Sequence, residues 1–157
     1  LYSAGEPNSR IIATLMHDSL QVLGLGYQDL AVSSETDLLG SLDTLCRSVD
    51  VLLIPTDNMM ASSISLIVKR AHHYKKPVIV SDSMLIEYGA LAAVGINYFN
   101  HGKQLAKQAL SRLTNKETIL HHAIEKSEAN EVVINSDVAC EYGITIPKDL
   151  LPFAVTP

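Results

Sequence analysis

Short apolar runs alternate with amphipathic helical stretches along almost the whole chain, and this alternation constrains its fold more than any other feature. The runs that suit buried strands are residues 1–3, 30–32, 51–54, 78–81, 91–95 and 131–134. Between them, apolar residues recur at the three- and four-residue spacing of a helix that buries one face. We therefore predict an α/β fold, a doubly wound parallel sheet with helices on both faces.

The helices are expected to begin and end at recognisable residues. Asn8 or Ser9 is expected to cap the first helix, and Ser34 the second, with Asp37 as its capping-box partner. A third helix is predicted to run unbroken from about Asn58 to Tyr74. The later helical stretches are expected at residues 84–88, 97–113 and 137–142, with a polar connector at 114–128.

The composition fits one domain with a real core and excludes several functions. The chain has 157 residues, of which 47% are hydrophobic, so it can bury a core of ordinary size. A net charge of −5 without a basic stripe argues against nucleic acid as a partner. No apolar run approaches the ~20 residues of a membrane helix. Cys46 falls on an apolar helical stripe, which predicts a buried free thiol.

Two of the apolar runs lead directly into polar residues that could form a ligand site. The run at 51–54 continues into Thr56, Asp57 and Asn58, and the run at 78–80 into Ser81 and Asp82. Ligands of parallel α/β sheets bind beyond the carboxyl ends of the strands. Two carboxylates at this edge would suit a cationic group such as the ammonium of an amino acid. The alternative is that each aspartate only caps the following helix, and the two roles are compatible.

The start of the first helix favours the opposite charge. Free N–H groups near Asn8 and Ser9, together with the helix dipole, would attract a carboxylate. Plain capping is the preferred alternative for these two residues. An edge that offers both preferences would nevertheless suit a zwitterion.

No pattern indicates catalysis, a cofactor or a metal. The chain has neither a G-x-S-x-G elbow nor a Walker loop, so we predict no catalytic residue and no enzyme activity. The adjacent pairs His72–His73 and His121–His122 lack the i, i+4 spacing of a zinc helix, and we expect all four to be solvated surface residues.

Several motifs resemble those of one protein family. They are LYSAGEPNS at 1–9, VDVLLIPTDN at 49–58, KPVIVSD at 76–82, YGALAAVGINY at 88–98, HGKQLAKQAL at 101–110, VIN at 133–135 and YGITIP at 142–147. In these motifs the chain resembles the ABC transporter substrate-binding proteins of the tryptophan/tyrosine-binding type. By position, the ligand-binding candidates Asp57, Asn58, Ser81 and Asp82 match cleft loops of that family, and Asn8 and Ser9 match the loop that starts its second lobe. Met84 departs from the family's usual residue and would add an apolar wall.

The resemblance implies one lobe of a type I periplasmic-binding-protein fold, in which two lobes close on a ligand. Residues 1–96 and 130–157 would form the second lobe. Residues 97–129 would be a crossover helix and connector toward a missing first lobe. Because the chain begins within a strand and without Met, we expect a fragment whose exposed apolar surface the first lobe would cover. A swap-like homodimer of the fragment is one alternative.

The expected function is the solute-binding component of an ABC importer. It would hold a small amino-acid-like ligand, such as an aromatic amino acid, in an interlobe cleft and present it to a membrane permease without catalysis. Its expected location is periplasmic or otherwise extracytoplasmic, with a lipid anchor left open. The alternatives are a periplasmic-binding-like sensor domain of a regulator or receptor, and a small α/β hydrolase that uses Ser81 or Asp82.

Overall fold

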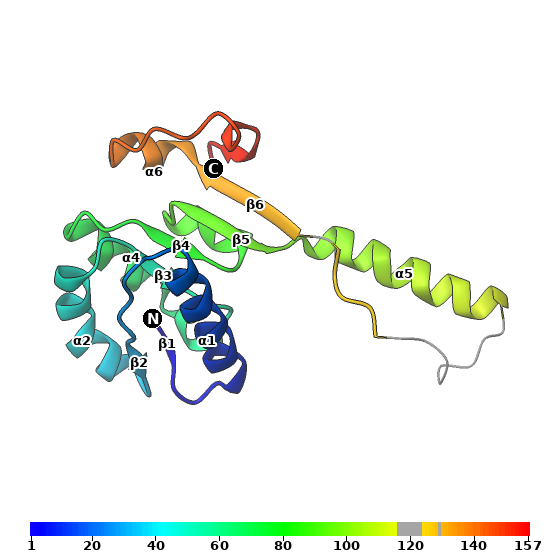
Figure 1. Cartoon of the computed structure of the whole chain (residues 1–157), viewed down its shortest axis with the longest axis horizontal. Coiled ribbons are helices and arrows are strands. Elements are labelled where there is room, and N and C mark those ends of the chain that lie inside the picture. The colour runs from blue at the N-terminus through cyan, green and yellow to red at the C-terminus, as the bar shows by residue number, and fades with distance from the viewer. Residues whose placement is uncertain (116–123, 129) are drawn as a thin grey trace.

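The computed structural model describes residues 1–115, 124–128 and 130–157, and strands and helices alternate along them (Figure 1). Residues 116–123 of the predicted connector lie outside the described residues, and so does the pair His121–His122. In chain order the elements are β1 (Tyr2–Ser3), α1 (Pro7–Val22), β2 (Ala31–Val32), α2 (Glu35–Ser48), β3 (Leu52–Ile54), α3 (Asn58–Ser62), α4 (Ile64–His73), β4 (Val78–Val80), the 3-10 helix η1 (Ser83–Tyr88), β5 (Ala92–Ile96), α5 (Tyr98–Asn115), β6 (Asn130–Asn135), α6 (Ser136–Glu141), the 3-10 helix η3 (Leu151–Phe153) and β7 (Ala154–Val155). Within this described part, no helix has the length and apolar character needed to cross a membrane.

The strands form a sheet in which most neighbours are parallel, as predicted. β1 pairs with β2, and a second sheet has the order β3-β4-β5-β6-β7. The nitrogen of Leu1 donates to the carbonyl oxygen of Leu53 at 3.0 Å, so the start of β1 lies beside β3. One pair departs from the predicted parallel sheet: β6 runs antiparallel to β5, from Ala92 opposite Ile134 to Ile96 opposite Asn130.

The core lies mainly between the sheet and the helices α2 and α4. Side chains that alternate along β3 and β4 point into this layer and are buried, as strand geometry requires. The buried apolar residues of these elements are Leu38, Leu42, Leu45, Cys46, Leu52, Ile54, Ile64, Ile67, Ala71, Val78 and Val80. The prediction that Cys46 is a buried free thiol is confirmed. Helix α1 covers the other face of the sheet, so helices lie on both faces (Figure 1).

Helix α5 projects away from the rest of the molecule (Figure 1). The helix predicted at 97–113 is therefore confirmed, with observed bounds Tyr98–Asn115. Several of its large apolar side chains face solvent, including Leu105, Leu110 and Leu113, which are 51%, 66% and 80% exposed. The chain leaves the sheet through α5 and returns through β6, which explains why β6 is antiparallel to β5.

The predicted cap of the first helix is wrong, whereas that of the second is correct. Glu6, not Asn8 or Ser9, is the N-cap of α1, because Pro7 occupies the first helical turn and needs no hydrogen bond for its nitrogen. The cap of the second helix is confirmed, since the Ser34 hydroxyl accepts from Asp37 N at 3.1 Å.

The helix predicted from Asn58 to Tyr74 is interrupted. Helix α3 ends at Ser62, and Ser63 leaves helical geometry with φ −98° and ψ 6° before α4 begins. The hydroxyl of Ser63 is buried and has no hydrogen-bond partner among the described residues. Periodicity does not reveal this break, because the apolar spacing continues through it.

Candidate functional site

The loops that follow β3 and β4 meet at one edge of the sheet. The two strands are parallel neighbours, with Leu52 opposite Val78 and Ile54 opposite Val80. Ser81 N donates to the carbonyl oxygen of Ile54 at 3.1 Å, which ties the second loop to the end of β3. Asp57 and Asp82 therefore follow strands that end side by side, at the edge where α/β sheets bind ligands.

Asp57 holds the backbone together at this edge. Its side chain is only 4% exposed. One carboxylate oxygen accepts from Ser3 N at 2.6 Å and the other from Met60 N at 3.0 Å. The first bond ties β1 to the loop after β3, and the second caps α3. The capping interpretation of Asp57 is thus confirmed, and both of its oxygens serve the protein.

Asp82 also caps a helix but keeps more of its carboxylate free. Its Oδ1 accepts from Met84 N at 3.0 Å at the start of η1. No hydrogen bond to Oδ2 is found among residues 1–115, 124–128 and 130–157. The hydroxyl of Ser81 donates to Ile54 O at 3.2 Å, so its oxygen can still accept from a ligand.

Gly95 allows β5 to approach this loop closely. A Cβ atom on Gly95 would lie 2.4 Å from the carbonyl oxygen of Ser81, a distance that real Cβ atoms essentially never show. Only glycine lets the backbones of β5 and the Ser81 loop come this near.

The first loop of the chain is tied to the loop after β3 by side chains. Asn8 Nδ2 donates to Thr56 O at 3.0 Å, and the hydroxyl of Ser9 donates to the same oxygen at 3.3 Å. Ser9 is fully buried, whereas Asn8 and Thr56 are exposed. Asn8 and Thr56 thus remain available to a ligand, while Ser9 fixes the loop.

Glu6 belongs to the site but was not among the predicted residues. Its carboxylate lies at the start of α3, where Oε1 accepts from Asn58 N at 3.0 Å and from Met59 N at 3.4 Å. Its Oε2 accepts from Asn58 Nδ2 at 3.2 Å. The sequence did indicate an anion at this place, because the free N–H groups at a helix start favour a negative charge nearby. The sequence does not say, however, which anion fills this place.

Glu131 is a second site residue that was not predicted. The hydroxyl of Ser83 donates to one of its oxygens, and Asn97 Nδ2 donates to the other at 2.7 Å. Glu131 thereby connects the loop after β4 with the place where the chain leaves β5 toward α5. No local pattern could have identified it, because its partners lie 48 and 34 residues away.

Hydrogen-bond acceptors predominate at this edge. It gathers the carboxylates Glu6, Asp57, Asp82 and Glu131, and none of the ion pairs found in the described part of the chain includes one of them. Apolar groups lie nearby in sequence and are exposed: Met84 by 67%, Tyr98 by 57% and Phe99 by 73%. Such an edge suits a ligand with an ammonium group and an apolar body.

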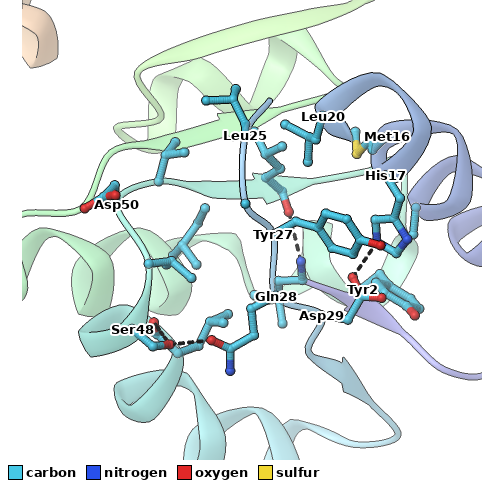
Figure 2. A pocket seen from close by; sticks show the side chains of 18 of the residues that line it. Tyr2, Met16, His17, Leu20, Leu25, Tyr27, Gln28, Asp29, Ser48 and Asp50 are labelled. Carbon is cyan, nitrogen blue, oxygen red and sulfur yellow. Dashed lines mark hydrogen bonds and ion pairs between the residues drawn. The ribbon is translucent and has the colours of Figure 1, made fainter. Parts of the chain in front are cut away.

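A cavity of about 530 Å³ lies elsewhere, and no predicted site residue lines it. Its walls come from α1, the following loop and the residues that precede and form β3. Figure 2 shows Tyr27 against His17, whose rings stack with centroids 4.1 Å apart, while His17 Nε2 lies 2.7 Å from Asp29 Oδ1.

A second histidine, His72, also pairs with a single acid. Its Nε2 lies 2.5 Å from Glu141 Oε1 at the contact between α4 and α6. Among the described residues, no group of three or more histidine, cysteine, aspartate or glutamate side chains could hold a metal ion.

Comparison with known proteins gives consistent matches. Residues 1–156 match the model of the family described as ABC transporter substrate binding protein. A curated "Tyrosine-binding protein" from Clostridioides difficile (strain R20291) is 28% identical over 137 residues, which cover 87% of this chain and 39% of that protein.

Two solved structures agree over nearly the whole chain. An ABC domain in complex with L-Trp from Streptococcus pneumonia is 27% identical, with a TM-score of 0.84 over 98% of this chain and 53% of that one. The ligand-free, open structure of a substrate binding protein with adhesive properties from Clostridium difficile is 27% identical, with a TM-score of 0.80 over 99% and 52%. The chain spans about half the length of these solved relatives and 39% of the length of the curated relative.

Proposed function

The chain belongs to the family of ABC transporter substrate binding proteins, and we propose that it is the solute-binding part of an ABC importer. The observation that carries the proposal is the acceptor-rich edge at the ends of β3 and β4, where Thr56, Asn58 and Met84 are exposed to solvent. One relative is named for binding tyrosine and another is solved with L-Trp. We infer that the ligand here is also a small amino acid, with an aromatic amino acid as the first choice.

The ligand would lie between two lobes. Residues 1–96 and 130–157 would form the second lobe, and residues 97–129 would cross to the first lobe and return. Two facts support this arrangement: α5 leaves the body of the molecule, and β6 returns beside β5. Closure of the lobes would bury the ligand and present it to a permease in the membrane. The expected location is therefore periplasmic or extracytoplasmic.

Some side chains at the edge would contact the ligand, and others would hold the loops in place. Asp82 would receive the ligand's ammonium on its free oxygen, with Asn58, Thr56, Ser81 and Asn8 as neutral partners. Asp57 and Ser9 would hold the loops in place, because their polar atoms are already bonded to the backbone. Nothing in this arrangement requires a bond to be made or broken, so we propose binding without catalysis.

The exposed leucines of α5 would be covered by the first lobe. In its absence they would favour a swap-like homodimer of this chain, in which each α5 packs on the other copy.

Calorimetry with L-tyrosine and L-tryptophan tests the proposal on the full-length gene product. We expect binding, and we expect Asp82→Asn to weaken it at least tenfold, because one charge-assisted hydrogen bond is lost. Asp18→Asn, which removes an exposed acid on α1, is the matched control and should change nothing. This chain alone should bind weakly or not at all, because it would supply only one side of the cleft. A millimolar affinity would correspond to only about 4 kcal/mol.

Two results would count against the proposal. Absence of binding for every amino acid tried would refute the function. Equal, tight binding by this chain and by the full-length product would refute the need for two lobes.

A further inference from the structure

We propose that Glu6 is a positioning residue that makes this edge select an ammonium group and reject a carboxylate. The inference rests on the proposed function and deepens it. Glu6 does not itself reach the ligand. It acts through Asn58, which is exposed at the edge and whose orientation Glu6 determines.

The first step is the chemistry of the contact between the two side chains. A carboxylate can only accept hydrogen bonds, so the amide atom of Asn58 that faces Glu6 Oε2 at 3.2 Å must be the donor, Nδ2. The other amide atom, Oδ1, then points away from Glu6. No hydrogen bond to Oδ1 is found among the described residues. Asn58 therefore presents an acceptor to a ligand, not a donor.

The second step concerns the backbone at the start of α3. Its N–H groups at Asn58 and Met59 would ordinarily attract an anion. Both already donate to Glu6 Oε1, at 3.0 and 3.4 Å. A ligand carboxylate would have to displace Glu6 to use them, and it would meet the charge of Glu6 on approach. The same residue thus blocks an anion and prepares an acceptor for a cation.

The third step is the charge around the contact. Asp57 and Asp82 flank the two loops, and neither forms an ion pair within the part of the chain that the structure describes. A carboxylate group of a ligand would be repelled here, whereas an ammonium would be stabilised. Glu6 strengthens this preference both directly, by its charge, and through Asn58.

The variant Glu6→Gln separates this role from simple support of the loop. Glutamine keeps the size of the side chain, and its Oε1 can still accept from the backbone N–H groups. Its Nε2, however, is a donor, so the Asn58 amide must turn and present Nδ2 to the ligand. The edge then loses one acceptor and one negative charge, while the fold of the loop is retained.

The experiment compares two ligands on the full-length gene product. L-Tryptophan has an ammonium group, and indole-3-propionate keeps the carboxylate and ring without it. The wild-type protein should prefer L-tryptophan, and Glu6→Gln should lower the ratio of the two affinities by roughly tenfold or more. A residue that only supports the loop would weaken both ligands equally and leave the ratio unchanged. Glu87→Gln, which removes an exposed acid on η1, is the matched control.

A double variant provides the rescue. When Glu6→Gln is combined with Asn58→Asp, the Nε2 of the introduced glutamine would donate to the new carboxylate, and an acceptor would again face the ligand. The preference for L-tryptophan should return toward the wild-type ratio. Should Glu6→Gln fail to fold, Asn58→Ala takes its place. This variant removes Oδ1 but keeps the two backbone N–H groups that donate to the Glu6 carboxylate. It should lower the ratio in the same way.

The outcomes separate the two proposals. Wild-type binding with an unchanged ratio in Glu6→Gln, or in Asn58→Ala if that variant is needed, overturns the role of Glu6 alone. A double variant whose ratio stays as low as that of Glu6→Gln also overturns it. Absence of amino-acid binding by the wild-type protein overturns the proposed function, and the inference about Glu6 with it.

Discussion

Replacing Gly95 by alanine should destabilise the fold through one defined clash. The added Cβ would lie 2.4 Å from the carbonyl oxygen of Ser81 and 3.1 Å from its carbonyl carbon. Both atoms are backbone, so no side-chain rotation can relieve the contact. β5 is held on its other side by the antiparallel pairing of Gly95 with Glu131. Either the Ser81 loop or β5 must therefore move.

Two opposing contributions set the size of the effect. Overpacking of this kind costs about 1–3 kcal/mol. Alanine also lowers the conformational entropy of the unfolded chain, which stabilises the folded state by about 0.4–1 kcal/mol. The clash is severe and involves backbone, so we expect a net loss near the upper end, about 2 kcal/mol. For a domain of this size, that loss lowers Tm by roughly 4–8 °C.

The assay is urea unfolding of the expressed chain, followed by circular dichroism, with thermal unfolding as a second measurement. Gly40→Ala is the matched control, because Gly40 lies within α2 and has nothing within 4 Å of an added Cβ. Alanine there should stabilise the helix by about 0.5–1 kcal/mol. The reasoning is refuted if Gly95→Ala is as stable as the wild type, or if the two variants shift stability in the same direction.

Two further predictions concern buried side chains. Asp57→Ala should lower the free energy of unfolding by about 2–4 kcal/mol in urea titrations, because it leaves the backbone N–H groups of Ser3 and Met60 without their acceptor; a loss below about 0.5 kcal/mol would contradict the structural role of this carboxylate. Burial, and to a smaller extent the charge of the neighbouring Asp43, raise the pKa of the Cys46 thiol. Iodoacetamide at pH 8 should therefore modify the exposed Cys140 in the native protein, and Cys46 only after unfolding. Equal rates of modification, followed by mass spectrometry, would show that Cys46 is accessible.

Much of the local structure could be predicted because it depends on residues close together in the chain. Ser34 caps α2, and Asp57 and Asp82 each accept from an N–H two or three residues later. Gly89 and Gly143 end their helical segments with φ of 94° and 67°, which glycine adopts at little cost. In each case the sequence contains both partners of the interaction within one turn.

The assignment of roles at the candidate site could not be predicted in the same way. Asp57 had two compatible interpretations, and only its two hydrogen bonds in the folded chain show that both oxygens are used by the protein. Glu6 and Glu131 could not be identified as site residues, because their partners lie 52 and 48 residues away. Hydrophobic periodicity carries no information about contacts over such distances.

The amino-acid sequence by itself determined the alternation of strands and helices, most of the caps and the edge at which polar side chains gather. These follow from backbone geometry and from which side chains can be buried. The tertiary structure alone decided which carboxylates turn inward, that β6 returns antiparallel to β5, and that Glu6 occupies the start of α3. The physical reason is that a hydrogen bond between distant segments forms only after packing of the core has brought their loops together.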